Sequence, residues 1–90
     1  MPRIGIITGV KSEEAALAPI MGSADAPIVR LSGARPARAR TGVEALIDLG
    51  VDGILSFGAA GAASSAQAPG NVLIGESVVD GEGYRYPADA

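Results

Sequence analysis

Four short apolar segments, none with a regular alternation of polar residues, constrain the fold of this 90-residue chain most strongly. They lie at residues 3–8 (RIGIIT), 26–31 (APIVRL), 51–57 (VDGILSF) and 71–79 (NVLIGESVV). Alternation is typical of a strand with one solvent-exposed face, whereas an unbroken apolar run is typical of a strand buried on both faces. The segments therefore predict the strands of a mainly parallel or mixed sheet.

Two helical segments separate the first three predicted strands. The first helix is expected to have Ser12 as its N-cap and to end near Pro19. The second is expected to begin at Pro36, because proline suits the first position of a helix, and to end at Gly50. Strands that alternate with helices predict a three-layer α/β fold, and the length predicts a single domain over residues 1–90.

Composition excludes several kinds of site and partner. The chain has no cysteine and no histidine, which excludes disulfides, thiol nucleophiles, Ser-His-Asp triads and the usual zinc ligand sets. We expect no metal and no other cofactor. The net charge of −3 argues against a nucleic-acid partner. No apolar run approaches the roughly 18 residues of a membrane span, and the N-terminus lacks the order of a secretory signal, so a cytoplasmic location is expected.

Three loops follow the predicted strands, at residues 8–14, 32–36 and 58–63, and parallel strands bring such loops to one edge of a sheet. The Gly-Ala loop at 58–63 either lets a flat or anionic ligand approach its backbone amides or serves only as a tight structural turn. Glu13 is either a general base or hydroxyl acceptor, or an anion that complements a helix start.

Arg35 stands at the corner between the second strand and the second helix. Together with the amides of the helix start it could bind a phosphate, although Pro36 removes one donor. From the residues alone the structural interpretation is favoured, both for this corner and for Glu13.

The order and spacing of these segments resemble the superfamily of purine nucleoside phosphorylases and methylthioadenosine/S-adenosylhomocysteine nucleosidases. The resemblance rests on IGIITGVKSEE near the N-terminus, the later Ser-Gly corner, GVDGILSFGAAGA, and PGNVLIGESVVDGEGYRYPAD. The sequences SFGAAG and DGEGYRYPAD look most similar to the hopanoid-associated phosphorylase branch. The resemblance covers essentially the whole chain, which corresponds to the N-terminal part of a family member.

The resemblance implies cleavage of the N-glycosidic bond of a purine nucleoside of the adenosine type. Glu13 matches the glutamate that orients or activates the attacking water in the family's nucleosidases, and Glu14 matches no role. The loop residues that match the lining of the ribose and purine site are Gly58, Ala59, Ala60 and Gly61. Arg35 is the candidate phosphate contact. Water and phosphate both stay open as the nucleophile.

Two departures from the family pattern bear on this expectation. Ala59 stands where many members have a serine near the nucleophile, and Ser56 stands where bacterial phosphorylases have a phosphate-binding arginine. The residues that hold the ribose hydroxyls and protonate the purine belong to the family's C-terminal half. The resemblance therefore implies a truncated or split enzyme that acts as a homo-oligomer or with a missing C-terminal half. The alternative is a non-catalytic α/β domain that binds a nucleoside or a partner subunit.

Overall fold

The computed structural model describes residues 3–61 and 64–88. The chain divides into two compact units, Met1–Ala60 and Gly61–Ala90. The first unit holds a parallel sheet with its helices, and the second holds a β-hairpin. In the described residues no helix has both the length and the apolar character needed to span a membrane. The single domain expected from the sequence stays a prediction.

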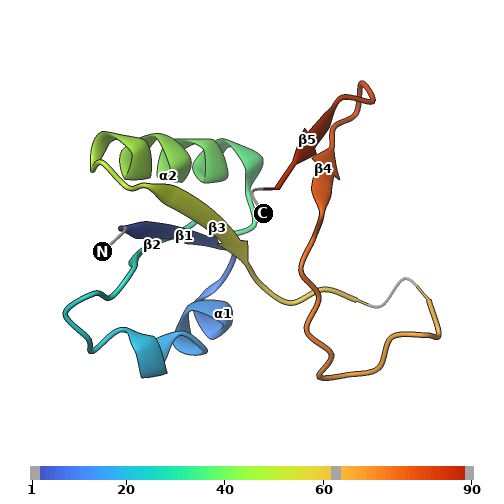
Figure 1. Cartoon of the computed structure of the whole chain (residues 1–90), viewed down its shortest axis with the longest axis horizontal. Coiled ribbons are helices and arrows are strands. Elements are labelled where there is room, and N and C mark those ends of the chain that lie inside the picture. The colour runs from blue at the N-terminus through green and yellow to red at the C-terminus, as the bar shows by residue number, and fades with distance from the viewer. Residues whose placement is uncertain (1–2, 62–63, 89–90) are drawn as a thin grey trace. The chain divides into compact units, whose positions relative to one another are not determined.

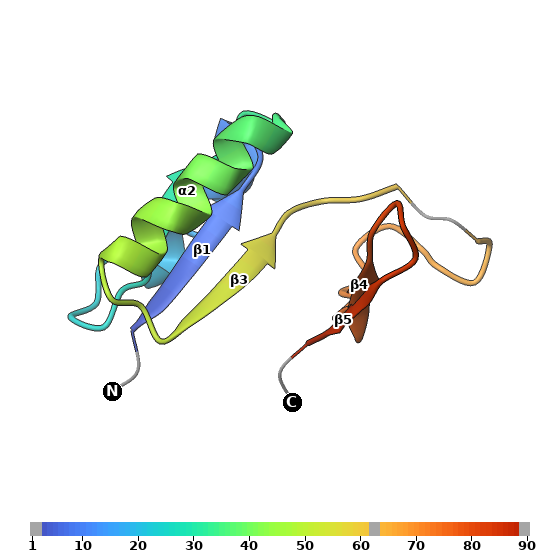
Figure 2. The ribbon, with the colours of Figure 1, turned by 90° about the horizontal axis from the view of Figure 1, so that it is seen from above.

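The sheet of the first unit has three parallel strands, which Figure 2 shows from above. They are β1 (Ile4–Thr8), β2 (Ile28–Leu31) and β3 (Gly53–Phe57), in the order β2-β1-β3. The register pairs Thr8 with Leu31 on one side and with Phe57 on the other, so the three strands end at the same level. The expected parallel sheet is confirmed for these three segments, with each strand one or two residues shorter than predicted.

The helices lie on both faces of this sheet (Figure 1). On one face lies α2 (Pro36–Asp48), and on the other lie α1 (Lys11–Ala15) and the 3₁₀ turn η1 (Ala18–Ile20). As predicted, α2 begins at Pro36, whose fixed φ and missing N–H suit a helix start. It ends just before Gly50, which adopts a φ of +79° that glycine tolerates best.

The first helix differs from its prediction at its start. Its N-cap is Val10 rather than Ser12, and the side chain that reaches back to the free amides is that of Glu13. The carboxylate accepts from the amides of Gly9 and Val10, and the Val10 carbonyl accepts the first hydrogen bonds of the helix. The helix is also short, since η1 with Pro19 follows it after one turn.

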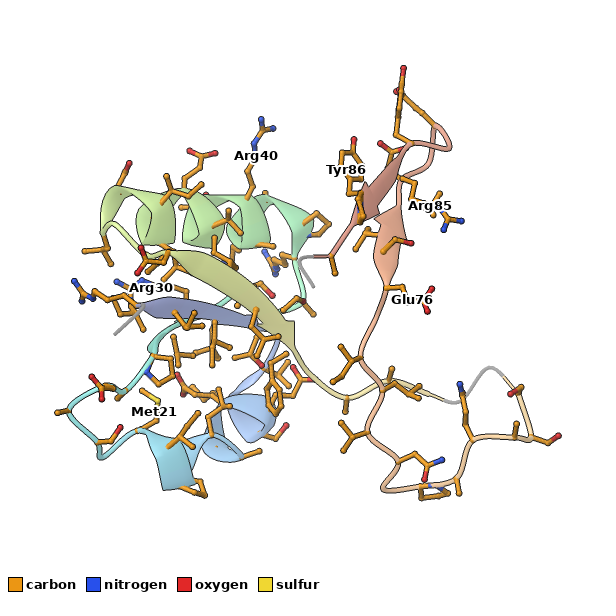
Figure 3. The ribbon with its side chains drawn as sticks, in the orientation of Figure 1. Met21, Arg30, Arg40, Glu76, Arg85 and Tyr86 are labelled. Carbon is orange, nitrogen blue, oxygen red and sulfur yellow. The ribbon has the colours of Figure 1, made fainter. Side chains whose placement is uncertain are left out.

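The core of the first unit lies where α2 crosses β1. Leu46 of α2 is 0% exposed, and a β-carbon added to Gly5 of β1 would lie 2.8 Å from its Cδ1 atom. The absence of a side chain at Gly5 therefore lets the helix approach the strand closely. The opposite face of α2 carries an ion pair between Arg40 and Glu44, 3.4 Å apart, and Figure 3 shows Arg40 pointing away from the sheet.

The prediction that every strand is buried on both faces holds for β1 but is wrong for β3. In β1 the adjacent residues Ile6 and Ile7 are both buried. In β3 Ile54 is 41% exposed and Leu55 is 50% exposed. The reason is that, within residues 3–61 and 64–88, β3 pairs only with β1, while α2 packs mainly against β1 and β2. An apolar edge strand results.

The predicted fourth strand is largely wrong. Of residues 71–79 only β4 (Ser77–Val79) is a strand, and it pairs antiparallel with β5 (Arg85–Pro87) instead of joining the parallel sheet. Residues 83–90 were not predicted to contain a strand. Figure 3 shows Arg85 and Tyr86 projecting to opposite sides of this hairpin, as neighbours in a strand do.

The turn between β4 and β5 explains the hairpin. The carboxylate of Asp80 accepts hydrogen bonds from the amides of Glu82 (2.9 Å) and Tyr84 (3.0 Å) and from the hydroxyl of Tyr86 (2.9 Å). Gly83 in this turn has a φ of +88°. The connection at residues 80–84 contains Gly81 and Gly83, and a loop of three to five residues with glycine between strands was the available sequence signal for a hairpin.

Candidate functional site

The strand order places a site between the carboxyl ends of β1 and β3. From β1 the chain passes through α1 to β2 on one side, and from β2 it passes through α2 to β3 on the other side of β1. The two connections run over opposite faces of the sheet (Figure 1). In parallel α/β sheets ligands bind at such a point, outside the carboxyl ends of the strands where the order reverses.

A hollow of about 240 Å³ lies at this point. Its lining comes from α1 with its C-cap and from the end of β3 with the loop after it, and consists of Ser12, Glu13, Ala16, Phe57, Gly58 and Ala59. The volume is below the 300–1,000 Å³ typical of a site that encloses a whole small ligand. The hollow therefore fits one part of a ligand, with a mostly apolar wall and one carboxylate.

Glu13 is held at this hollow by four hydrogen bonds. Its Oε1 atom accepts from the amides of Gly9 (2.9 Å) and Val10 (3.3 Å) and from the hydroxyl of Thr8 (3.2 Å). Its Oε2 atom accepts from the amide of Ala59, which is 46 residues away in sequence and follows β3 (2.8 Å). The carboxylate therefore ties the loop after β1 to the loop after β3.

The hydrogen bonds stabilise the anionic form of this group. They lower the pKa of Glu13 below its ordinary value of 4.5, with the Ala59 amide as the largest cause and the Gly9 amide next. Glu13 is therefore anionic at neutral pH. A general base is most effective with a pKa near the working pH, so the lowered pKa favours the alternative that Glu13 accepts hydrogen bonds from a ligand.

This charge predicts a pH dependence. Because the pKa of Glu13 is lower in the folded protein, the stabilisation by its hydrogen bonds is complete above about pH 4.5 and is lost as the pH falls through the lowered pKa. We expect a carboxyl carbon NMR titration to give a midpoint for Glu13 below 4.5. Equilibrium unfolding should show stability falling in the same acidic range. A midpoint above 4.5 would contradict the observed hydrogen bonding.

Gly58 has to lack a side chain for this arrangement to exist. A β-carbon at this position would lie 2.7 Å from Oε2 of Glu13 and 3.2 Å from Oε1. At this one position of the Gly-Ala loop, the need for a small residue has a structural reason, which is the close approach of the Glu13 carboxylate.

Replacing Gly58 with alanine is therefore expected to displace the Glu13 carboxylate and to break its bond to the Ala59 amide. The amide resonance of Ala59 should move and the pKa of Glu13 should rise towards its ordinary value, both measurable by NMR. Gly53→Ala is the matched control in the preceding strand, since its new β-carbon would lie 3.6 Å from Ile4 Cδ1, an ordinary contact. Equal responses of the two variants would contradict the prediction.

The structure brings together some of the predicted site residues and not others. Glu13, Gly58 and Ala59 meet at the hollow, and Ala60 follows as an exposed residue that does not line it. Gly61 belongs to the second unit. Ala62 and Ala63, the last two residues of the predicted loop, lie outside the described residues.

The predicted phosphate contact is not part of the hollow. Arg35 is the exposed N-cap of α2, after β2, whereas the hollow lies between β1 and β3. Glu14, to which the sequence assigned no role, does not line the hollow either. Within residues 3–61 and 64–88 no group of three acidic, histidine or cysteine side chains could hold a metal ion.

Two residues of the site, Phe57 and Ala16, lie outside the loops selected from the sequence, and two others, Thr8 and Ser12, lie in the selected loop 8–14 but were given no ligand role. Thr8 and Phe57 are the last residues of β1 and β3, and their position at the carboxyl ends of predicted strands was a usable signal. Ser12 was interpreted as a helix cap, and Ala16 carries no signal beyond its place one turn further along.

Comparisons with protein-family models, with curated proteins and with solved structures find no match to this chain.

Proposed function

We propose that the chain binds a purine nucleoside at the hollow between β1 and β3 and takes part in cleavage of its N-glycosidic bond. The observation that carries the proposal is the Glu13 carboxylate, fixed at the reversal of strand order beside a small, mostly apolar hollow. The sequence resemblance supplies the substrate class. The proposal includes the three-layer nucleoside-phosphorylase-like architecture and a cytoplasmic location, both of which stay predictions.

A fixed anion suits this reaction. Cleavage of a glycosidic bond develops positive charge on the sugar, and a preorganised negative group close to that charge stabilises the transition state. Glu13 can also accept a hydrogen bond from a ribose hydroxyl or from a water molecule. Phe57 offers an aromatic surface to a flat base, and Gly58 and Ala59 keep the backbone close to the ligand.

The same wall favours water over phosphate as the attacking group. Among the residues that the structure describes, Glu13 is the one ionisable residue that lines the hollow, and its charge repels an anion. Arg35, the candidate phosphate contact, follows β2 and is not part of the wall. A phosphate nucleophile would need a cation that the described wall does not provide.

The second candidate function is non-catalytic binding of a nucleoside. It is favoured because no described residue of the wall other than Glu13 is an acid, and a purine leaves readily only when its ring nitrogen is protonated. For the same reason, we propose that the chain forms homo-oligomers or binds a partner that supplies an acid to protonate the purine.

A titration with adenosine, combined with an assay for free base, tests both candidates. Binding should be followed by NMR, with the largest shifts at Glu13, Gly58 and Ala59. Chromatography of the same samples detects adenine. Binding with adenine release supports catalysis, and binding without release supports the second candidate. No shift at these residues in millimolar adenosine would exclude both candidates.

A further inference from the structure

We propose that Thr8 is a positioning residue whose buried hydroxyl holds Oε1 of Glu13, so that Oε2 is the oxygen that remains open to a hydroxyl or water of the ligand. The identity of the ligand rests on the proposed function, whereas the positioning of Glu13 by Thr8 does not. Thr8 lies in the loop selected from the sequence but was given no role of its own there.

The placement of Thr8 makes its hydroxyl a fixed reference point. The residue is 1% exposed and ends the central strand β1, between its partners Leu31 and Phe57. Its backbone carbonyl accepts a hydrogen bond from the amide of Ser32 (2.9 Å) after β2. A β-branched side chain in a central strand has few rotamers, so the direction of the Thr8 hydroxyl is set by the backbone.

The hydrogen bonds divide unequally between the two carboxylate oxygens. A carboxylate has about four acceptor positions, two on each oxygen. Among the described residues Oε1 receives three donors, from Thr8, Gly9 and Val10, whereas Oε2 receives only the amide of Ala59. Oε1 is therefore saturated, and the unused acceptor capacity of Glu13 lies on Oε2. A ligand group that binds there has to be a donor, such as a hydroxyl or a water molecule, and not an anion.

A simpler explanation makes the hydroxyl of Thr8 a passive partner. A buried hydroxyl needs an acceptor, and a nearby carboxylate satisfies it without any effect on Glu13. In that case the Gly9 and Val10 amides would hold Oε1 by themselves. The two explanations differ in what happens to Glu13 when the hydroxyl is removed and the shape is kept.

The test compares Thr8→Val, which removes the hydroxyl, with Thr8→Ser, which keeps it. In the full 90-residue chain, we expect the valine variant to raise the pKa of Glu13 and to shift the Ala59 amide resonance, both followed by NMR. The serine variant should restore both values. The groups that shift the pKa of Glu13 are backbone amides, the Thr8 hydroxyl and partial desolvation, with no charged side chain among them. A change in its titration therefore reports the hydrogen bonds and the desolvation of the carboxylate, and the comparison with Thr8→Ser separates the two.

Adenosine gives the second readout. With one hydrogen bond to a charged acceptor disturbed, we expect its affinity to fall about tenfold in Thr8→Val and to recover in Thr8→Ser. Thr8→Ala repeats the comparison with a side chain too small to overpack the strand. An unchanged Glu13 titration and an unchanged Ala59 resonance in the valine and alanine variants would overturn the positioning role. If the unmodified protein does not bind adenosine, the proposed function fails, while the titration still decides the role of Thr8.

Discussion

Replacing Leu46 with alanine is expected to destabilise the first unit by about 2–5 kcal/mol, the usual range for a buried leucine. Leu46 is 0% exposed and its terminal methyl groups lie against the backbone of Gly5, where no side chain can move in to fill the space. A domain of this size has about 5–15 kcal/mol of stability in total. Urea unfolding followed by circular dichroism should show a large shift of the midpoint.

The control for this prediction is the neighbouring residue on the same helix. Ile47 is 61% exposed, so Ile47→Ala removes similar apolar volume from α2 without opening a cavity. Its effect should stay within about 1 kcal/mol, as is usual for exposed positions. If the two variants unfold at the same urea concentration, α2 does not pack on β1 through Leu46.

Glu13→Gln is expected to weaken adenosine binding by about tenfold to a hundredfold, the range for loss of a hydrogen bond to a charged group. Glutamine has the same shape, but only one of its two terminal atoms accepts hydrogen bonds. Its terminal NH₂ group would face either the donors around Oε1 or the Ala59 amide. The hydrogen bonds on that side of the side chain are therefore lost together with the negative charge. Isothermal titration calorimetry measures the change.

Glu14→Gln provides the matched control for the charge. Glu14 occupies the next position of the same short helix and does not line the hollow. Its replacement therefore removes one negative charge and leaves the hydrogen bonds of Glu13 in place. Adenosine affinity should stay within twofold of the unmodified protein. Equal losses for both variants would mean that the net charge of α1, and not the fixed carboxylate, attracts the ligand.

Local sequence signals were sufficient for the helices and strands that are specified by residues close together in the chain. The apolar runs predicted β1, β2 and β3, and Pro36 and Gly50 marked the ends of α2, because the extended preference of β-branched residues, proline geometry and a positive φ act within a few residues. The same signals failed at residues 71–79. Apolar character does not specify a partner, and the turn at Asp80 directs β4 to β5.

The candidate site was predicted only in part, for a related reason. The sequence by itself determined that Glu13 and the Gly-Ala loop follow strands, and that parallel strands bring such loops to one edge. Only the tertiary structure decided that β1 and β3 are neighbours, so that the Ala59 amide meets the Glu13 carboxylate, and that Arg35 stands apart after β2. Strand order depends on which side of β1 each connection crosses. That choice is made by packing between residues far apart in the chain, such as Leu46 against Gly5, and no short stretch of sequence encodes it.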